Sequence, residues 1–463
     1  MSWPVSTAQG QLTINRYVNA SNTAIAIDQD KFSTLNWVNN GLTNISGLSV
    51  RVVLSSVNPP DDVFLVGETE AYLSYNLGAT NGVTNATVYT QVVTNEATSL
   101  DQTFAVTNAS PGLTNEWDLT VVNLPGNAGS AVFNYWRLIL TGGAVTNGTI
   151  APGAQGIVSG SDGYTVTATV SAGSGAGTNA VTAFVTNGQS LNFSGGLGGS
   201  GELAKTGAGT LSVGASTNFS GSFRLGEGTA NFTATNSLGT GTLVQSNGSS
   251  TAVFSAGDTY AQNMSLYKVS FTNSGNTLSG TITNNNTVYD VAAGTTNTLS
   301  GLVTGSGGLE LIGGGVLAVT GTTNSYTGDT TISNGTLRIT TLADSNTVSS
   351  VGTSNNITLA GANATNAILD YTGGNVATDR TFVLTNGGGT INMTSSTTEM
   401  TLTGSASGAG TLIVGEGTLI LSNTGTSNSF APAAIQVDSG ATLELAANDQ
   451  IGNSTGLILN GGT

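Results

Sequence analysis

The sequence predicts an all-β protein in two parts, an antiparallel β-sandwich over residues 1–142 and a parallel β-solenoid over residues 181–463. Three observations predict this fold class. A stretch of short strands bounded by Gly, Asn, Ser and Thr occurs three times, and no apolar residues recur at helical three-four spacing. All four Trp residues lie before Gly153, where a two-layer core would use them.

The clearest repeat is Gly305–Ile339. It holds three alternating apolar pairs, Leu309/Leu311, Leu317/Val319 and Leu337/Ile339. Pairs this short predict strands of three to five residues with one buried face, and the Gly and Asn residues between them supply corners with positive φ. A single unit of this kind needs a stacked neighbour to cover its apolar face, which predicts a solenoid.

The repeat occurs three times, at Ser200–Val213, Ser306–Val319 and Gly408–Leu421. Alignment of the copies places Leu203, Leu309 and Leu412 in one column and Leu211, Leu317 and Leu419 in another. The copies lie about 105 residues apart, several times the ~20–30 residues of one solenoid turn. We therefore expect about a dozen turns in all, with corner Asn and Thr residues stacked into ladders.

An aromatic residue follows each copy at the same place, preceded by an Asn. These residues are Phe219, Tyr326 and Phe430. An aromatic residue that recurs at one corner favours inward packing, and a strip of sugar-binding rings is the alternative.

The pattern GSGxLxKxGxGTLxV, then an Asn and an aromatic residue, then TGxTxIxxGTLxI, resembles the autotransporter-associated β-strand repeat, also called the passenger-associated transport repeat. The resemblance covers roughly residues 181–463, and in the third copy Ala431-Pro432 replaces the Thr-Gly step. It implies a right-handed parallel β-helix in a secreted bacterial protein. It implies no particular activity.

The composition fits a thin apolar seam in a polar, uncharged shell. Of the 463 residues, 38% are hydrophobic and 7% are charged, against typical values near 45–50% and 25%. The net charge of −16 argues against nucleic acid as a partner, because nucleic acid selects basic patches. Cysteine is absent, which excludes disulfides and thiolate chemistry.

The ends of the chain lack processing signals. Met1–Val5 has neither a basic nor an apolar leader region, and the chain ends within repeat-like sequence at Gly461–Thr463. We expect the numbered chain to be a portion of a longer protein. No apolar run approaches the ~18 residues of a membrane helix, so we expect no membrane insertion.

The first part of the chain carries longer predicted strands and six of the seven Pro residues. The predicted strands are Leu48–Ser56, Glu70–Leu77, Thr87–Thr94, Trp117–Val122 and Ala131–Thr141. They predict the antiparallel sandwich of residues 1–142. Residues 143–180 are rich in Gly, Ala, Ser and Thr, and we expect a linker or a cap on the first solenoid turn.

A search for chemistry assigns no catalytic, cofactor-binding or metal-binding residue. The chain has no His, which removes the commonest general base and His-based metal sites. The acidic residues of the repeats are scattered: Glu202, Glu227, Asp258, Asp290, Glu310, Asp329, Asp344, Asp370, Asp379, Glu399, Glu416, Asp438, Glu444 and Asp449. Residues one turn apart can still meet in space, so paired carboxylates stay an open alternative.

Three local motifs invite a ligand interpretation. Asp28-Gln29-Asp30 and Asp61-Asp62 are carboxylate pairs, but neither continues into a calcium-loop pattern, which favours solvated turns. Gly198–Thr206 ends in Lys-Thr like a phosphate loop, yet Ala204 precedes the Lys and strands follow. Turn glycines explain that segment without a nucleotide.

These features predict a non-enzymatic extracellular structural protein, the subunit of a bacterial surface filament, surface layer or adhesive stalk, with itself as partner. The end strand Leu457–Leu459 lacks a polar cap, and we expect Gln11–Tyr17 with Ala24–Ile27 to serve as a strand that pairs with a neighbouring subunit. The alternative is a monomeric adhesin or autotransporter-like passenger that binds surface glycans. A polysaccharide lyase or hydrolase is a third, weaker hypothesis.

Overall fold

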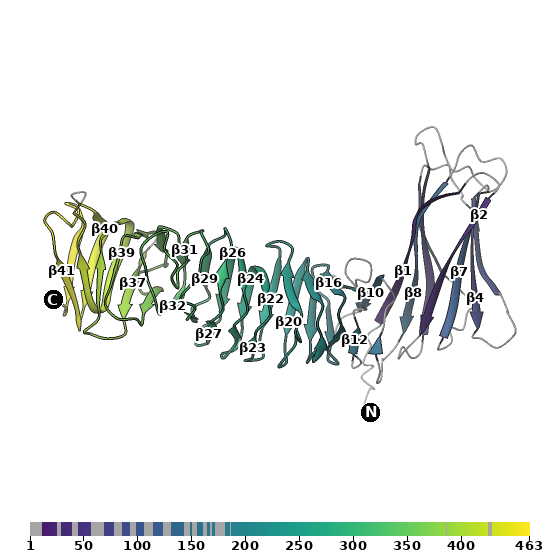
Figure 1. Cartoon of the computed structure of the whole chain (residues 1–463), viewed down its shortest axis with the longest axis horizontal. Helices are drawn as coiled ribbons and strands as arrows, with labels where there is room; N and C mark the ends of the chain where they lie inside the picture. Colours follow the sequence, from purple (N-terminus) through teal and green to yellow (C-terminus); the bar gives the residue numbers. More distant parts are fainter. Residues whose placement is uncertain are drawn as a thin grey trace, which may run out of the picture. The chain divides into compact units, whose positions relative to one another are not determined.

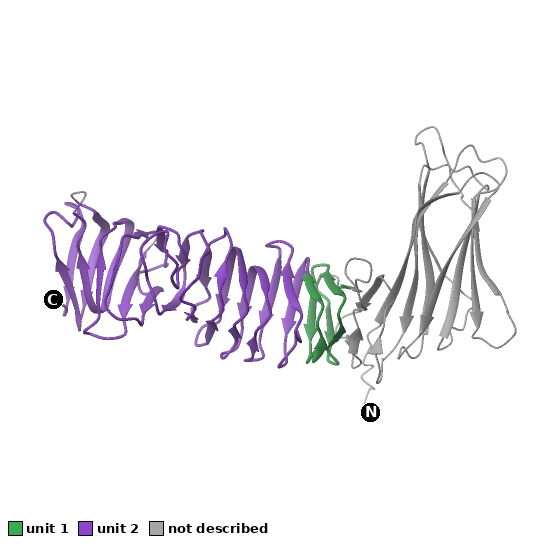
Figure 2. Ribbon diagram, in the orientation of Figure 1, with its two compact units in different colours: residues 1–224 green, residues 225–463 purple. Residues whose placement is uncertain are grey.

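The structure is a computed structural model that describes residues 182–185, 187–385, 387–424 and 428–463, together with the backbone of the strands that precede them. The chain divides into two compact units, Met1–Arg224 and Leu225–Thr463 (Figure 2). No helix occurs in the described ranges, as the sequence predicts.

The first strands of unit 1 pair mostly antiparallel. Their bounds are β1 Leu12–Ile25, β2 Gln29–Val38, β3 Ile45–Ser56, β4 Thr69–Leu77, β5 Ala86–Val92, β6 Ser99–Ala105, β7 Thr114–Asn123, β8 Ala131–Gly142, β9 Thr149–Ile150, β10 Gln155–Gly160, β11 Tyr164–Val166 and β12 Thr169–Ser171. One sheet has the order β2-β7-β4-β5, and β8 lies between β1 and β3 in another. The five predicted strands are present as β3, β4, β5, β7 and β8.

The sandwich itself stays a prediction, because the side chains that would pack between its sheets lie outside the described residues. The boundaries at residues 142 and 180 are likewise untested. The segment proposed for a neighbouring subunit forms β1, which pairs with β8 and β10 of its own chain.

Parallel solenoid turns follow within unit 1. Their strands are β13 Val181–Phe184, β14 Ser190–Phe193, β15 Leu197–Gly199, β16 Glu202–Thr206, β17 Thr210–Val213, β18 Asn218–Phe219 and β19 Ser222–Leu225. β14 pairs in parallel with β17, and Leu191 pairs with Leu211, so the chain completes one turn between these two residues. Both side chains are buried, which is the alternate-residue burial that the short apolar pairs predict.

Unit 2 repeats the same construction (Figure 1). Its strands are β20 Gly228–Phe232, β21 Thr242–Gln245, β22 Ser250–Phe254, β23 Thr259–Tyr260, β24 Met264–Phe271, β25 Thr277–Leu278, β26 Ile282–Val291, β27 Thr296–Leu299, β28 Val303–Thr304, β29 Leu309–Ile312, β30 Val316–Val319, β31 Thr330–Ile332, β32 Gly335–Ile339, β33 Asn356–Leu359, β34 Ala367–Tyr371, β35 Val376–Thr378, β36 Thr381–Leu384, β37 Gly388–Met393, β38 Glu399–Leu402, β39 Ala406–Leu421, β40 Phe430–Asp438, β41 Ala441–Leu445 and β42 Gly456–Asn460.

The turns of unit 2 stack in register. Leu299 pairs with Val319 and Val319 with Ile339, at the same spacing along the chain in both cases. The three pairs of the clearest repeat fall in β29, β30 and β32, and the side chains of all six residues are buried. The predicted parallel solenoid is therefore confirmed for the described residues, while the right-handed sense of its winding stays a prediction.

The third copy differs from its prediction. Its two apolar stretches form one continuous strand, β39, instead of two strands separated by a corner. Gly408 and Gly417 still hold positive φ values of 127° and 83°, and the pairing register shifts within the strand. The turn bends at these glycines without interrupting the strand, because residues without a Cβ tolerate that conformation.

Aromatic rings stack inside unit 2. Phe232, Phe254 and Phe271 occupy the same register position on successive strands, with ring centroids 5.3 and 5.8 Å apart. Tyr260 meets Phe254 edge to face at 4.6 Å. The three Phe rings contact one another from turn to turn at similar distances, so these contacts favour the in-register stacking of turns.

Buried polar side chains satisfy the backbone at the corners. Asn276 Nδ2 donates to Asn297 Oδ1 at 2.9 Å, and Asn276 Oδ1 accepts from the Gly257 amide at 2.9 Å. Gln245 makes four bonds to the backbone, donating to the carbonyls of Ser250 and Lys268 and accepting from two amides. The predicted amide ladder is thus present over Asn276 and Asn297, whereas Gln245 binds the backbone directly.

One buried cation organises a much longer turn. The turn from Ile339 to its ladder partner Tyr371 is long because it contains the loop of residues 340–355. The side chain of Arg380 is fully buried, and its Nε donates to the Ala343 carbonyl at 2.7 Å. Its other nitrogens bind Asp344 O, Thr347 O, Ser349 Oγ, Gly352 O and Ser354 O. Burial lowers the pKa of Arg380 from its ordinary value.

We expect the substitution Arg380→Met to reduce the free energy of unfolding by about 3–5 kcal/mol, because it leaves several loop carbonyls buried without donors. The measurement is thermal unfolding together with limited proteolysis of the 340–355 loop. The matched control is Arg224→Met, because Arg224 makes an exposed pair with Glu202, which contributes less than about 1 kcal/mol. Equal stability of the two variants would contradict this prediction.

Buried tyrosines make the solenoid sensitive to alkali. Burial raises the pKa of Tyr260, Tyr289 and Tyr326 well above its ordinary value. In the unfolded chain these hydroxyls ionise near pH 10. The stability that each buried, protonated tyrosine contributes is therefore fully present below about pH 10. It is lost as the pH rises toward the pKa of that tyrosine in the folded chain, by up to about 1.4 kcal/mol for each pH unit and each tyrosine.

The expected outcome is a melting temperature that falls steeply above about pH 10. The variant Tyr289→Phe should fall less steeply, since one of the three ionisable groups is gone. Tyrosinate absorbance followed through the same titration should rise together with unfolding. A melting temperature that does not change up to about pH 11 would show that this linkage is absent.

Candidate functional site

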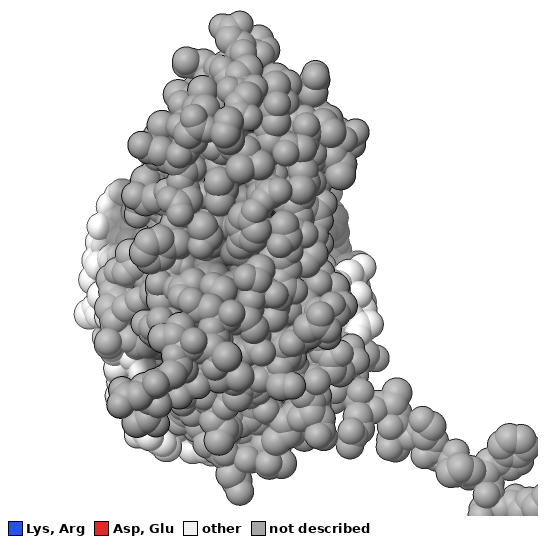
Figure 3. Space-filling model, turned by 90° about the vertical axis from the view of Figure 1, so that its right-hand side faces the viewer, with Lys and Arg blue, Asp and Glu red and all other residues white. Residues whose placement is uncertain are grey.

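Charged residues are sparse in this chain, at 7% of all residues. The few atoms of described residues that are visible in Figure 3 belong to uncharged residues. Within these ranges, no three Asp, Glu, His or Cys side chains come together in a group that could hold a metal ion. Pairs of acids do occur: Asp344 and Asp379 lie next to each other, since the Asp379 amide donates to Asp344 Oδ1 at 3.0 Å.

Several of these acids have structural partners. Glu202 pairs with Arg224 through two bonds of 2.9 and 2.8 Å. Asp370 is 4% exposed and accepts from Arg338 Nε at 2.7 Å. Asp379 accepts from the amide of Ser345 at 2.6 Å. These carboxylates stabilise neighbouring turns or the 340–355 loop.

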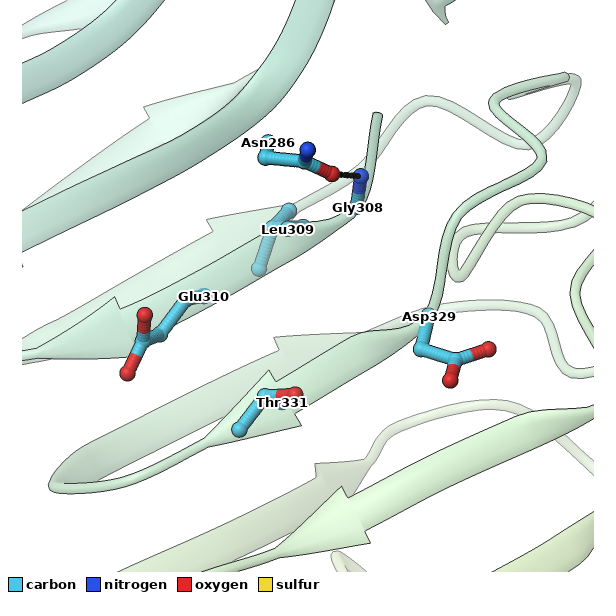
Figure 4. A pocket seen from close by; sticks show the side chains of 6 residues that line it. All are labelled: Asn286, Gly308, Leu309, Glu310, Asp329 and Thr331. Atoms are coloured by element: carbon cyan, nitrogen blue, oxygen red, sulfur yellow. Dashed lines mark hydrogen bonds between the residues drawn. The ribbon is translucent and has the colours of Figure 1, made fainter. Parts of the chain in front are cut away.

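The hollow around Gly308 is a candidate ligand site on the outer surface of unit 2. It is an open depression of about 300 Å³. It is lined by Asn286, Gly308, Leu309, Glu310, Asp329 and Thr331 (Figure 4). We call it the Gly308 hollow. It lies at the starts of β29 and β31, with Asn286 inside β26 on the preceding turn.

Strand register explains how the hollow forms. Thr287, Leu309 and Thr330 are ladder partners on three successive turns, so the residues just before them, Asn286 and Gly308, also lie on adjacent turns. Glu310 pairs with Thr331. Gly308 places no side chain on the surface between its neighbours, and a Cβ there would overlap the backbone oxygen of Asp329. The close approach of two turns thus requires a glycine at position 308, which adds no side chain to the hollow.

Hydrogen bonds fix the polar groups of the hollow. Asn286 has a φ of 56° and accepts from the Gly308 amide through Oδ1 at 2.9 Å. Glu310 Oε1 accepts from Ser333 Oγ at 2.9 Å. The side chains of Glu310 and Asp329 point to opposite sides of the hollow (Figure 4). This geometry gives two separate acceptors, and it does not bring the carboxylates together as a catalytic pair would require.

The ligand motifs found in the sequence have other roles, where they are described. Lys205 is fully buried and donates to the carbonyls of Thr206 and Gly207 at 3.1 and 2.6 Å. This burial agrees with the expectation that its segment binds no nucleotide. The Asp28 and Asp61 motifs lie outside the described residues.

The three recurring aromatic residues are core residues. Phe219 is 1% exposed, and Tyr326 and Phe430 are fully buried. The expectation of inward packing is confirmed, and a sugar-binding strip of these rings is wrong. The Asn beside Tyr326 is buried too: Asn324 Oδ1 accepts from the Val303 amide at 2.9 Å, on the preceding turn.

We expect Phe219→Ala to reduce the free energy of unfolding by about 3–5 kcal/mol, since it leaves a cavity between turns. Phe184→Ala is the matched control, because Phe184 is 42% exposed, and it should change stability by less than about 1 kcal/mol. Chemical denaturation of both variants measures the difference. A Phe219 variant as stable as the control would mean that this ring does not close the turn.

No motif in the sequence indicates the Gly308 hollow. Glu310 and Asp329 appear there only as two scattered acids, and Asn286 as one of many Asn residues. The neighbouring residues Asn285-Asn286 and Gly307-Gly308 are types that favour corners, but of these four only Asn286 has a positive φ. Which acids border those corners depends on the length of each turn.

Comparison with known proteins finds a curated relative. An alignment 142 residues long that covers 29% of the chain is 42% identical to a protein of Brucella suis biovar 1 (strain 1330) named adhesin BmaC autotransporter. The chain spans only 4% of the length of that relative. No family model matches the chain, and no solved structure matches it. The repeat family suggested by the motifs therefore stays a resemblance.

Within the described ranges, no helix has the length and apolar character needed to cross a bilayer.

Proposed function

We propose that this chain is a segment of an autotransporter-like passenger that is exposed on the bacterial surface and acts as an adhesin. The observation that carries the proposal is the 42% identity over 142 residues to a protein named as an autotransporter adhesin. The parallel solenoid of the described residues agrees with it, since stacked turns present a long outer surface for binding. A passenger at the cell surface accounts for both observations.

Binding fits the surface geometry better than catalysis does. The carboxylates of the Gly308 hollow point apart, and no group of three metal-ligating side chains occurs in the described part of the chain. These observations favour a non-enzymatic role for the described turns. The lyase or hydrolase hypothesis predicts sugar release from a polysaccharide, which a reducing-end assay would detect.

The filament hypothesis predicts contacts between copies of the chain. Assembly through strand or solenoid-end contacts between copies remains a prediction, because the structure contains a single chain. The passenger proposal requires no such contact. Electron microscopy of the purified chain separates the two, since regular fibres would support assembly and discrete particles would support a monomeric passenger.

Adhesion of the whole chain is the direct test. Beads coated with the purified chain should bind to eukaryotic cells or to extracellular matrix several-fold more than control beads. The controls are beads with the heat-denatured chain and beads with an unrelated acidic protein of similar net charge. Binding no greater than that of the acidic control would contradict the adhesin proposal, because charge alone would then explain it.

A further inference from the structure

The side chains that line the Gly308 hollow are almost all polar. Its lining contains two carboxylates, one amide and one hydroxyl, from Glu310, Asp329, Asn286 and Thr331. Leu309, its one apolar residue, is 1% exposed and faces the core. A ligand held here must therefore be recognised by polar contacts, because the hollow offers almost no apolar surface.

The polar side chains of the hollow have hydrogen-bonding atoms that can still bind a ligand. Glu310 uses Oε1 to accept from Ser333, and no residue in the described ranges donates to its Oε2. Asn286 uses Oδ1 to accept from Gly308, and its Nδ2 has no acceptor among the described residues. Asp329 accepts from Ser354 and from Asn356 Nδ2, the latter at 3.2 Å, and each carboxylate oxygen can accept more than one bond.

Three other ligand classes fit poorly. An anion has no Lys or Arg in the lining to bind it. A calcium ion needs about six to eight oxygen ligands around one point, whereas the Glu310 and Asp329 carboxylates point to opposite sides. An apolar ligand would leave both carboxylates desolvated without partners. Ligands with several separated donors match what remains, and the amino-bearing glycans of the test distinguish ammonium donors from hydroxyl donors.

We propose that the Gly308 hollow binds the hydroxyl groups of an uncharged saccharide chain. Separate hydroxyls of one or two sugar residues donate to Glu310 and Asp329, and Asn286 Nδ2 donates to a sugar oxygen. The volume of about 300 Å³ is at the small end of ligand sites. Because the hollow is open, a longer chain can continue along the surface past it. This inference rests on the proposed adhesin function and names its ligand class.

The test compares binding of the full chain to immobilised neutral, acidic and amino-bearing glycans. The wild-type chain should bind neutral glycans. Glu310→Gln keeps a carbonyl oxygen for Ser333 and removes the charge, and Asp329→Asn does the same for its partners. Each substitution should weaken binding about tenfold or more, since hydrogen bonds to charged acceptors are the strong ones.

Glu416→Gln is the matched control, because Glu416 is another half-buried glutamate on a strand of unit 2 that lies outside the hollow. It should leave glycan binding unchanged. Melting temperatures of the three variants close to that of the wild type show that a loss of binding is local. As a second measurement, Thr331→Arg places a long side chain beside Glu310 and should abolish binding.

The outcomes separate this inference from the adhesin proposal. Neutral-glycan binding that falls in Glu310→Gln and Asp329→Asn but not in Glu416→Gln supports the site. Wild-type affinity in both hollow variants overturns it, as does a wild-type chain that binds no neutral glycan or binds only with calcium. Absence of bead adhesion in the wild type would overturn the proposed function, whereas glycan binding by the hollow variants alone decides the site.

Discussion

In-register stacking of parallel turns is the constraint on which the rest of this structure depends. Each turn has one apolar inner face and no second layer of its own, so its core is completed by the turns on either side. Leu317 of β30 pairs with Leu337 of β32, which pairs with Leu369 of β34, and all three are buried. A change in register by one residue would place these side chains outside, because successive strand residues face opposite sides.

At the corners between strands, backbone polar groups lose their partners in the strand ladder. The backbone leaves the strand ladder there, and its amides and carbonyls need other partners when they are buried. Small corners use single amide side chains such as Asn276, Asn324 and Gln245. The large 340–355 loop needs more donors in one place, and the guanidinium of Arg380 supplies them. A guanidinium suits the role because it presents five N–H donors and no acceptor.

The outer face of the turns does not have to pack against a core, so its residues can serve in binding. Strand packing requires outward residues only to tolerate solvent and their ladder neighbours. The Gly308 hollow shows how a requirement of the core shapes the surface. The close approach of Gly308 to Asp329 excludes a side chain at position 308, and the hollow beside it is bordered by polar groups that hydrogen bonds hold in place. Such a surface suits recognition by many weak polar contacts along a passenger.

The sequence by itself determined the all-β class, the strands β29, β30 and β32, and the inward position of the recurring aromatic residues. These follow from the alternation and recurrence of residue types, which are local properties of the sequence. Only the tertiary structure decided the continuity of β39, the wrapping of a loop around Arg380, and the hollow at Gly308. The physical reason is that turns differ in length, from the short turn between Leu299 and Val319 to the long one between Ile339 and Tyr371. Which side chains meet across adjacent turns depends on how many residues each turn contains. A local sequence pattern does not give that number.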